Sequence, residues 1–156
     1  MAGKMKITVI GAGHGGKAMA AHLALMGFPT TLYNRTFERI RAIHELGGIE
    51  LESADINVRG FGKLEKATDN MQEALENAQM IMVVVPSSAH ADIALACAPY
   101  LKDGQIVVLH PGRTCGAIEF AQVLRKNGCK AKAIISETET FIYASRSEGP
   151  ATARIF

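Results

Sequence analysis

The stretch Lys6–Gly16, KITVIGAGHGG, decides how the rest of the chain is interpreted. A run of β-branched and apolar residues leads into Gly11-x-Gly13-x-x-Gly16, and a pattern of small residues typical of a helix follows at once. Strand, tight turn and helix start form the context in which this glycine spacing binds a dinucleotide. We expect Gly11 to make the turn, Gly13 to let a pyrophosphate approach the backbone, and Gly16 to let helix and strand pack closely. The N–H groups and the positive end of the helix dipole then hold the phosphates.

The same stretch overlaps a second phosphate-binding pattern. GAGHGGKA matches the G-x-x-x-x-G-K-[ST] loop of nucleoside triphosphatases except at its last residue, Ala18. Alanine lacks the hydroxyl that holds Mg²⁺ in that loop, so dinucleotide binding is favoured. The alternative is a glycine-rich turn without a ligand. The cofactor-contacting residues expected here are Gly11, Ala12, Gly13, His14, Gly15 and Gly16; for His14, an exposed loop residue is the alternative.

Size and composition indicate one α/β domain over residues 1–156. Such a chain buries roughly 70% of its unfolded surface. The net charge of +2 gives no reason to expect nucleic acid or an anionic membrane as partner. Cys97, Cys115 and Cys129 are odd in number and widely spaced, which favours free thiols in a reducing cytoplasm. No apolar run reaches the roughly 18 residues of a membrane span, and no spacing typical of a metal site is present.

Alternating strand and helix patterns predict a doubly wound, mainly parallel sheet with helices on both faces. Six strands interleave with helices when a short β-hairpin, expected as an insertion, is counted as one of them. After the first strand, the expected strands are 30–33, 80–85, 106–109 and 131–135, with the hairpin over 49–61 turning at Ser53–Asp55. The expected helices are 17–26, 36–46, 68–77, 87–101 and 117–126, with Thr36, Thr68 or Asp69, and Ser87 or Ser88 as N-caps. Two extended arms, 141–146 and 151–156, surround Glu148-Gly149-Pro150.

The end of the second predicted strand indicates which cofactor is preferred. NAD-selective domains carry an Asp or Glu there, about 20 residues past the glycines, for the ribose 2′-hydroxyl. This chain instead reads Asn34-Arg35-Thr36. Arg35 can pair with a 2′-phosphate and stack on the adenine, while Asn34 and Thr36 can donate hydrogen bonds. We therefore predict NADP(H), with NAD possible; the alternative is a solvated Arg35 and a capping Thr36, with both cofactors accepted.

Four segments together resemble the opine dehydrogenase family, the octopine/nopaline dehydrogenase type. They are GAGHGGKAMAAHLALMG at 11–27, VVVPSSAHADIA at 83–94, HPGRTCGAIEF at 110–120 and ETETFIYASR at 137–146. Ketopantoate reductase and glycerol-3-phosphate dehydrogenase resemble the chain more distantly. The resemblance implies reductive condensation of an amino acid with a 2-oxo acid, using hydride from NADPH. It also implies a C-terminal helical domain with a catalytic His–Asp pair.

The resemblance assigns site residues to three further segments. Val84, Val85, Pro86 and Ser87 match the loop that borders the cofactor after the fourth strand. Pro111, Gly112 and Arg113 match the loop after the fifth strand, near nicotinamide and substrate, and Thr140 matches a threonine of the substrate cleft. Arg113 can clamp a substrate carboxylate. The alternatives are a surface loop for Arg113 and a strand hydroxyl for Thr140.

No catalytic residue is assigned within this chain. The family's catalytic histidine is matched by none of His14, His22, His44, His90 and His110. Ser87, Ser88, His90 and Asp92 are close in sequence but lack a nucleophile elbow, so they are expected to be capping and solvated residues. Because the chain stops inside its last arm, we expect it to be one domain of a longer protein, with pairing of two chains possible. The rival hypothesis is a stand-alone NAD(P)-sensing module.

Overall fold

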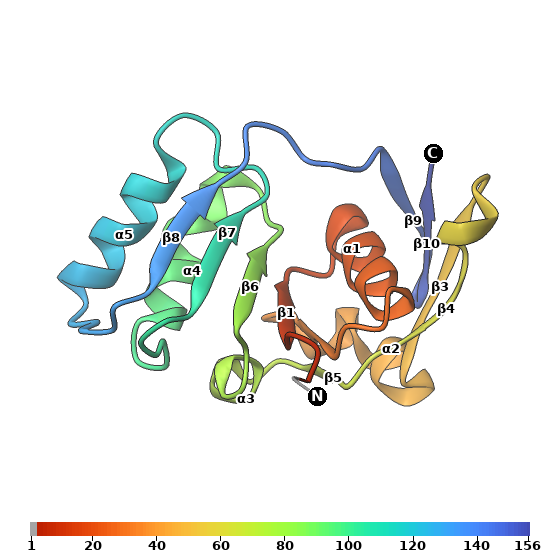
Figure 1. The fold of residues 1–156 in the computed structure, drawn as a ribbon, viewed down its shortest axis with the longest axis horizontal. Helices are drawn as coiled ribbons and strands as arrows, with labels where there is room; N and C mark the ends of the chain where they lie inside the picture. Colours follow the sequence, from red (N-terminus) through yellow and green to blue (C-terminus); the bar gives the residue numbers. More distant parts are fainter. Residues whose placement is uncertain (1–2) are drawn as a thin grey trace.

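The computed structural model describes residues 3–156, which form two β-sheets (Figure 1). The main sheet has six parallel strands in the order β5-β2-β1-β6-β7-β8. Its strands are β1 (Ile7–Ile10), β2 (Thr30–Tyr33), β5 (Lys66–Thr68), β6 (Met80–Val83), β7 (Ile106–Leu109) and β8 (Ile134–Glu137). Counted within this sheet alone, the order is 3-2-1-4-5-6, as in doubly wound dinucleotide-binding sheets. The predicted fold class is confirmed.

Helices cover both faces of the main sheet. They are α1 (His14–Leu25), α2 (Arg41–Leu46), α3 (Met71–Leu75), α4 (His90–Cys97) and α5 (Gly116–Lys126). One hydrophobic cluster joins α3, α4 and α5 to side chains such as Ile81 and Leu109. A second cluster joins α1 and α2 to the other face, where Val9 and Leu32 point. The alternation of Ile10 and Val9 between the two clusters follows from the two-residue repeat of a strand.

A second sheet of four strands packs on the far side of α1 (Figure 1). Its strands, in spatial order, are β4 (Gly60–Lys63), β3 (Gly48–Ser53), β10 (Thr152–Ile155) and β9 (Ser145–Gly149). The predicted hairpin is therefore present as antiparallel β3 and β4, and β3 also pairs in parallel with β10. β4 lies unusually close to the helix, because a Cβ on Gly62 would come within 2.5 Å of the Ala21 carbonyl oxygen.

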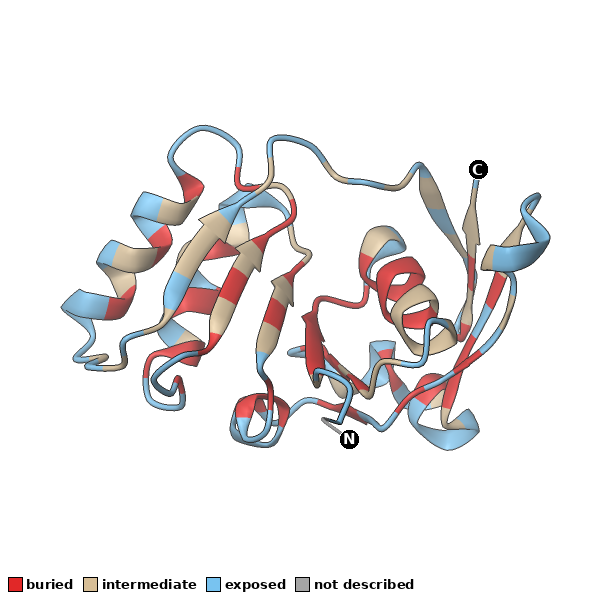
Figure 2. Cartoon of the chain, viewed as in Figure 1, coloured by how far each residue is buried: buried red, intermediate tan, exposed pale blue. Residues whose placement is uncertain are grey.

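Helix α1 is buried between the two sheets. Every residue from Gly16 to Ala21 is buried, as the red colouring of the middle of the helix shows in Figure 2. A helix that is covered on both sides needs no polar stripe, which explains why α1 carries small apolar residues on more than one side. The alanines keep the helix thin, so that both sheets approach it. The middle of α1 therefore lies packed between the two sheets.

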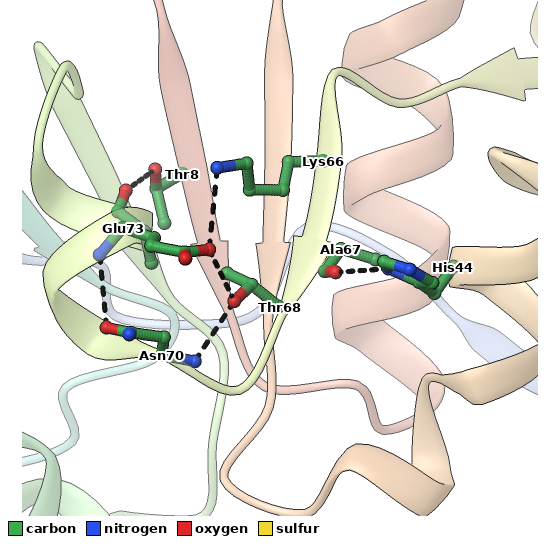
Figure 3. A network of polar contacts seen from close by, with 8 residues as sticks. Thr8, His44, Lys66, Ala67, Thr68, Asn70 and Glu73 are labelled. Atoms are coloured by element: carbon green, nitrogen blue, oxygen red, sulfur yellow. Dashed lines mark hydrogen bonds and ion pairs between the residues drawn. The ribbon is translucent and has the colours of Figure 1, made fainter.

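The short edge strand β5, which the sequence did not predict, is held by a polar network (Figure 3). Glu73 Oε2 lies 3.4 Å from Lys66 Nζ and accepts a hydrogen bond of 3.1 Å from Thr68 Oγ1. Asn70 Oδ1 accepts from the Glu73 N–H at 3.3 Å, so Asn70 caps α3. The predicted caps Thr68 and Asp69 were wrong, because Thr68 belongs to β5.

Other element boundaries also differ from the prediction. Instead of one helix over 36–46, a 3₁₀ turn (Phe37–Arg39) precedes α2, and Thr36 makes no side-chain capping bond. Likewise a 3₁₀ turn (Ser87–Ala89) precedes α4, which ends at Cys97, two residues before Pro99. Proline lacks the N–H and the space that continuing the helix would require. Helix α1 begins at His14 rather than residue 17.

Three predicted extended segments were shifted. The strand expected at 131–135 is β8 (Ile134–Glu137), which begins three residues later. Ahead of it, the Lys132 N–H donates to Asp103 Oδ1 at 2.7 Å rather than to a strand of the sheet. The second hairpin strand begins at Gly60, since a 3₁₀ turn (Ile56–Val58) takes up the connection. The arm expected at 141–146 becomes strand only from Ser145, and Phe141 instead packs over Gly15.

Candidate dinucleotide-binding site

The three glycines of the first turn have three different surroundings. Gly11 has φ +108°, and a Cβ there would collide with the Val84 carbonyl oxygen. A Cβ on Gly16 would collide with the carbonyl oxygen of Gly11. A Cβ on Gly13, in contrast, would meet no atom within 4 Å. Gly11 and Gly16 therefore let the chain fold, whereas Gly13 leaves open space beside the backbone.

That open space lies at the start of α1, where the backbone points its N–H groups outward. Gly13 is the N-cap residue, with φ −79° and ψ −167°, and since glycine has no side chain it supplies no capping bond to the N–H groups of the first turn. The first turn of α1 contains no acidic residue. An unpaired helix start with a positive dipole end is suited to a phosphate group.

A cleft of about 420 Å³, here called the switch-point cleft, opens at the carboxyl ends of the neighbouring strands β1 and β6, where the chain continues to α1 on one face of the sheet and to α4 on the other. Ligands of doubly wound sheets bind at this point, outside the carboxyl ends of the strands. Its walls come from the glycine turn, the end of β2, the end of β6 and helix α4. The lining residues are Ile10, Gly11, Ala12, Gly13, Tyr33, Asn34, Arg35, Arg39, Val84, Val85, Pro86, Ser88, Ala89, Asp92, Ile93 and Ala96.

A second hollow of about 510 Å³, the helix-start cavity, adjoins the cleft on the side of the second sheet. The two share Ala12, Gly13 and Arg39. The helix-start cavity is further lined by His14, Lys17, Glu38, Ser147 and Pro150. The backbone of the glycine turn therefore has open space on both sides.

Asn34 holds the glycine turn against the end of β2. Its Oδ1 accepts a hydrogen bond of 3.2 Å from the Ala12 N–H, and its Nδ2 donates one of 3.0 Å to the Thr36 carbonyl oxygen. The residue is buried. The sequence suggested Asn34 as a donor to phosphate, whereas the structure gives it a positioning role. Thr36 is exposed and lies outside the residues that line the cleft.

Arg35, which was predicted to pair with a 2′-phosphate, extends from the rim of the cleft. Its side chain is 74% exposed, and its Nη1 lies 4.0 Å from Asp92 Oδ2, which is also exposed. Exposed pairs at this distance contribute little to stability. The guanidinium is therefore available to a ligand at the end of β2.

Lys17 does not point toward the glycine turn as a phosphate-loop lysine would. It is only 6% exposed, and its Nζ donates to Ser147 Oγ at 2.9 Å and to the carbonyl oxygens of Gly149 and Pro150 at 3.1 and 2.9 Å. Burial, and secondarily the charge of Arg39, lower the pKa of Lys17. His14 makes a parallel contact, since its Nδ1 accepts from the Ser147 N–H at 2.8 Å. Both side chains tie the start of α1 to the β9–β10 hairpin.

The remaining predicted residues fall into two groups. Val84, Val85 and Pro86 line the cleft, but Ser87 does not, because the turn after β6 presents Ser88 and Ala89 instead. Pro111, Arg113 and Thr140 lie outside both hollows. Arg113 has φ +59° in the loop after β7, and Thr140 is exposed. The structure therefore does not bring these three residues to the cofactor end of the cleft.

Sequence reasoning missed Arg39 and the cleft-facing side of α4. Arg39 follows Arg35 by four residues, so a cluster of arginines after the second strand was the available signal. Across residues 3–156 there is no group of three or more His, Cys, Asp or Glu side chains placed to hold a metal ion. In the same range, no helix is both long and apolar enough to cross a membrane.

Comparison with known proteins identifies the family. Residues 6–112 match the family described as NAD-dependent glycerol-3-phosphate dehydrogenase N-terminus. The chain belongs to this family. It is the NAD-binding part of such dehydrogenases, so the predicted cofactor domain is confirmed.

Within this dehydrogenase family the chain is similar to opine dehydrogenases. It is 37% identical over 142 residues to opine dehydrogenase of Arthrobacter sp. (strain 1C), which covers 91% of this chain and 39% of the relative. A glycerol-3-phosphate dehydrogenase [NAD(P)+] of Carboxydothermus hydrogenoformans is 32% identical over 130 residues, covering 79% of this chain and 34% of the relative. The predicted likeness to opine dehydrogenases is confirmed, and the chain spans less than half of either relative.

A solved structure of octopine dehydrogenase with NADH and L-arginine shares the fold. It superposes with a TM-score of 0.84 at 18% identity, over 98% of this chain and 40% of the other. The second sheet is therefore included in the shared fold, since the superposition covers nearly all residues.

Proposed function

We propose that the chain binds NADP(H) in the switch-point cleft and serves as the cofactor domain of an opine-dehydrogenase-like oxidoreductase. The observation that carries the proposal is the open backbone at Gly13, at the unpaired start of α1 and beside the cleft. A pyrophosphate there would receive N–H groups and the helix dipole. Val84, Val85 and Pro86 would border the remainder of the cofactor.

The preference for NADP(H) rests on the end of β2. Asn34 stands where an NAD-selective domain has a carboxylate, and Arg35 follows it on the rim. A 2′-phosphate on the ribose would meet a guanidinium rather than a negative charge. NADH, which lacks that phosphate, would still bind through its pyrophosphate.

The reaction of the whole protein is proposed from the resemblance. Hydride from NADPH would reduce the imine formed between an amino acid and a 2-oxo acid, with the catalytic His–Asp pair on a helical domain beyond residue 156. This chain's share would be to orient the cofactor. Arg113 and Thr140, outside the cleft, would then meet substrate only together with that domain. The three cysteines are unpaired, which supports a reducing cytoplasm as the location.

Gly13→Val tests the cofactor site. The valine side chain would fill space that is open in the folded chain but needed by the pyrophosphate. We expect the affinity for both NADH and NADPH to fall by at least about a hundredfold, which is about 2.7 kcal/mol. We expect the stability to change by no more than about 1 kcal/mol, the usual scale of an N-cap substitution. Calorimetric titration and urea unfolding measure the two quantities.

The outcome that overturns the site is unchanged affinity in a folded Gly13→Val variant, or no binding of either dinucleotide by the unaltered chain. Binding of NADPH by this chain alone would not distinguish between two possible reactions of the whole protein. The family match favours a glycerol-3-phosphate-dehydrogenase-like reductase as the second candidate. NADPH oxidation by the longer gene product distinguishes them, with pyruvate plus amino acids in one arm and dihydroxyacetone phosphate in the other.

A further inference from the structure

We propose that Glu137 is a positioning residue, whose carboxylate fixes the loop that presents Arg113 to the substrate. The inference rests on the proposed function and deepens it, because it names the side chain that sets the place of Arg113. Glu137 is the last residue of β8, and the loop runs from His110, after β7, to Cys115, before α5. Since β7 and β8 are parallel neighbours, the loop and Glu137 meet at the carboxyl end of the main sheet (Figure 1).

The start of α5 is capped by Glu137 rather than by its own N-cap residue. Cys115 is the N-cap, and its side chain makes no capping bond. Instead, Glu137 Oε2 accepts a hydrogen bond of 2.6 Å from the Ala117 N–H in the first turn. A carboxylate here satisfies a donor that the helix leaves unpaired, and it lies at the positive end of the helix dipole. The bond therefore joins the end of the loop to β8.

The carboxylate of Glu137 is not engaged by a basic side chain. Within residues 3–156 it belongs to no ion pair. The buried His90 lies close to the start of α5, but neither of its ring nitrogens has a hydrogen-bond partner in the described residues. The hydrogen bond to the Ala117 N–H is therefore the contact through which Glu137 acts.

The loop closes around the Glu137 side chain. A Cβ on Gly112 would collide with that side chain, and a Cβ on Gly116 would lie 3.2 Å from Glu137 Oε2. Glycine on both sides of Arg113 thus leaves the space that the carboxylate occupies. The Gly112 N–H also donates to the Thr138 carbonyl oxygen at 3.1 Å. The loop is therefore attached to the end of β8 both before and after Arg113.

Between these two attachments the backbone is strained. Arg113 has φ +59° and Cys115 has φ +66°, in the left-handed region that residues other than glycine rarely adopt. Such conformations persist where the surrounding structure holds them, and they are concentrated at functional sites. The Arg113 side chain is exposed and forms no ion pair among residues 3–156. Its place is therefore set by the backbone of the loop, and through the loop by Glu137.

The same region also carries Thr140, the second proposed substrate residue. The Thr138 N–H donates to the Leu109 carbonyl oxygen, at the end of β7, at 2.9 Å. Thr138 Oγ1 lies 3.2 Å from that oxygen and 2.9 Å from the Thr140 carbonyl oxygen. The segments that carry Arg113 and Thr140 are thus fixed to one another. Because a misplacement of about 1 Å can cost about a hundredfold in rate, release of the loop should weaken substrate binding.

The experiment compares Glu137→Ala and Glu137→Gln with Glu119→Ala in the longer gene product. Glu119 is an exposed carboxylate in the same first turn of α5 and serves as the matched control. Pyruvate is varied with a fixed mixture of amino acids, and NADPH is varied separately. In Glu137→Ala, the KM for pyruvate should rise about ten- to a hundredfold. The KM for NADPH and kcat should stay within about twofold, since the loop lies outside the cofactor cleft.

Glu137→Gln distinguishes the hydrogen bond from the charge. Glutamine keeps a side-chain oxygen that can accept from the Ala117 N–H, so the KM for pyruvate should return to within about threefold of the unaltered protein. Glu119→Ala should match the unaltered protein. In the 156-residue chain, NMR should show at least about tenfold faster exchange of the Ala117 amide in Glu137→Ala and little change in Glu137→Gln.

Two results would overturn the role of Glu137. One is a KM for pyruvate in Glu137→Ala within twofold of the unaltered protein, and the other is an equal rise in the KM for NADPH, which would indicate general damage. A Glu137→Gln variant as impaired as Glu137→Ala would overturn the hydrogen bond as the cause. In all three cases the unaltered protein still oxidises NADPH, so the proposed function would stand. Absence of NADPH oxidation by the unaltered protein with pyruvate and any amino acid would instead refute the proposed reaction, and this inference with it.

Discussion

At the scale of single residues, the polar side chains around the cleft differ in whether they hold the loops or face the ligand. Asn34 and Lys17 are buried and bonded to backbone or hydroxyl groups of neighbouring segments. Arg35 and Arg39 are exposed on the rim. A buried polar group must be satisfied internally, whereas an exposed guanidinium pays little to exchange water for a phosphate. Around the cleft, burial therefore separates the residues that hold the loops from those that can reach a ligand.

Two buried histidines lead to a prediction about acid stability. His90 is 1% exposed and His110 7% exposed, and within residues 3–156 both nitrogens of His90 and Nδ1 of His110 have no hydrogen-bond partner. Burial lowers the pKa of both imidazoles, and the carboxylates of Glu119 and Glu137 only partly oppose this for His90. The unfolded chain therefore binds more protons than the folded chain between those lowered values and about pH 6.5.

Stability is consequently complete above about pH 6.5 and falls as the pH drops through this window, by up to about 1.4 kcal/mol per pH unit for each histidine. Urea unfolding at several pH values between 7.5 and 5 measures the slope. His90→Leu should make the slope shallower without a large loss at pH 7.5, because it removes a titrating group that has no polar partner. A slope equal to that of the unaltered chain would contradict the assignment.

At the scale of elements, helix α1 is the part that the second sheet positions. The β9–β10 hairpin supplies three acceptors to Lys17 Nζ and one N–H to His14. β4 approaches the helix backbone at Gly62. The helix whose start carries the glycine turn is thus fixed on both sides, by the main sheet and by the second sheet.

The variant Lys17→Met tests two points together: the attachment of α1 to the second sheet, and the rejected interpretation of Lys17 as the lysine of a phosphate-binding loop. Methionine keeps the apolar part of the side chain but leaves the Pro150 carbonyl oxygen without its donor and the Gly149 carbonyl oxygen with only the Ser147 hydroxyl as donor. We expect a loss of stability of about 1–3 kcal/mol, the scale of a buried unsatisfied group, with faster amide exchange in β9 and β10. The NADPH affinity should change by less than about threefold. A loss of a hundredfold or more would mean that Lys17 binds phosphate after all.

The elements also differ in how far the sequence could predict them. The strands Met80–Val83 and Ile106–Leu109 were predicted because an unbroken apolar run bounded by Pro or Gly has few alternatives, although only every second residue of each is buried. β5 was not, since three residues with one lysine carry no periodic signal. The glycine turn and Arg35 were predicted from local motifs, and residues 84–86 of the cleft were predicted from the family resemblance. The role of Lys17 depends on contacts with a segment far away in sequence, which no local pattern reveals, whereas Arg39 was missed although it follows Arg35 by only four residues.

At the scale of the whole molecule, the two hydrophobic clusters share the main sheet and only one of them reaches the second sheet. The proposed cofactor site lies between them, because Ile10 and Tyr33 belong to the first cluster while Ala12 belongs to the second. A ligand there would contact the ends of β1, β2 and β6 and the start of α1 at once. Binding of the ligand would then stabilise both halves of the structure.

Cofactor binding should therefore protect the second sheet as well as the main sheet. At a free NADPH concentration of 100 times its dissociation constant, the free energy of unfolding rises by about 2.7 kcal/mol. If α1 couples the sheets, amides of β10 (Thr152–Ile155) should gain protection against hydrogen exchange together with those of β1 (Ile7–Ile10), although β10 lies outside both hollows. Exchange measured by mass spectrometry with and without NADPH gives both values from one sample. In Lys17→Met the gain at β10 should shrink while the gain at β1 remains, because the hairpin has lost its bonds to the helix. Protection confined to β1 in the unaltered chain would show instead that the second sheet opens independently of the cofactor site.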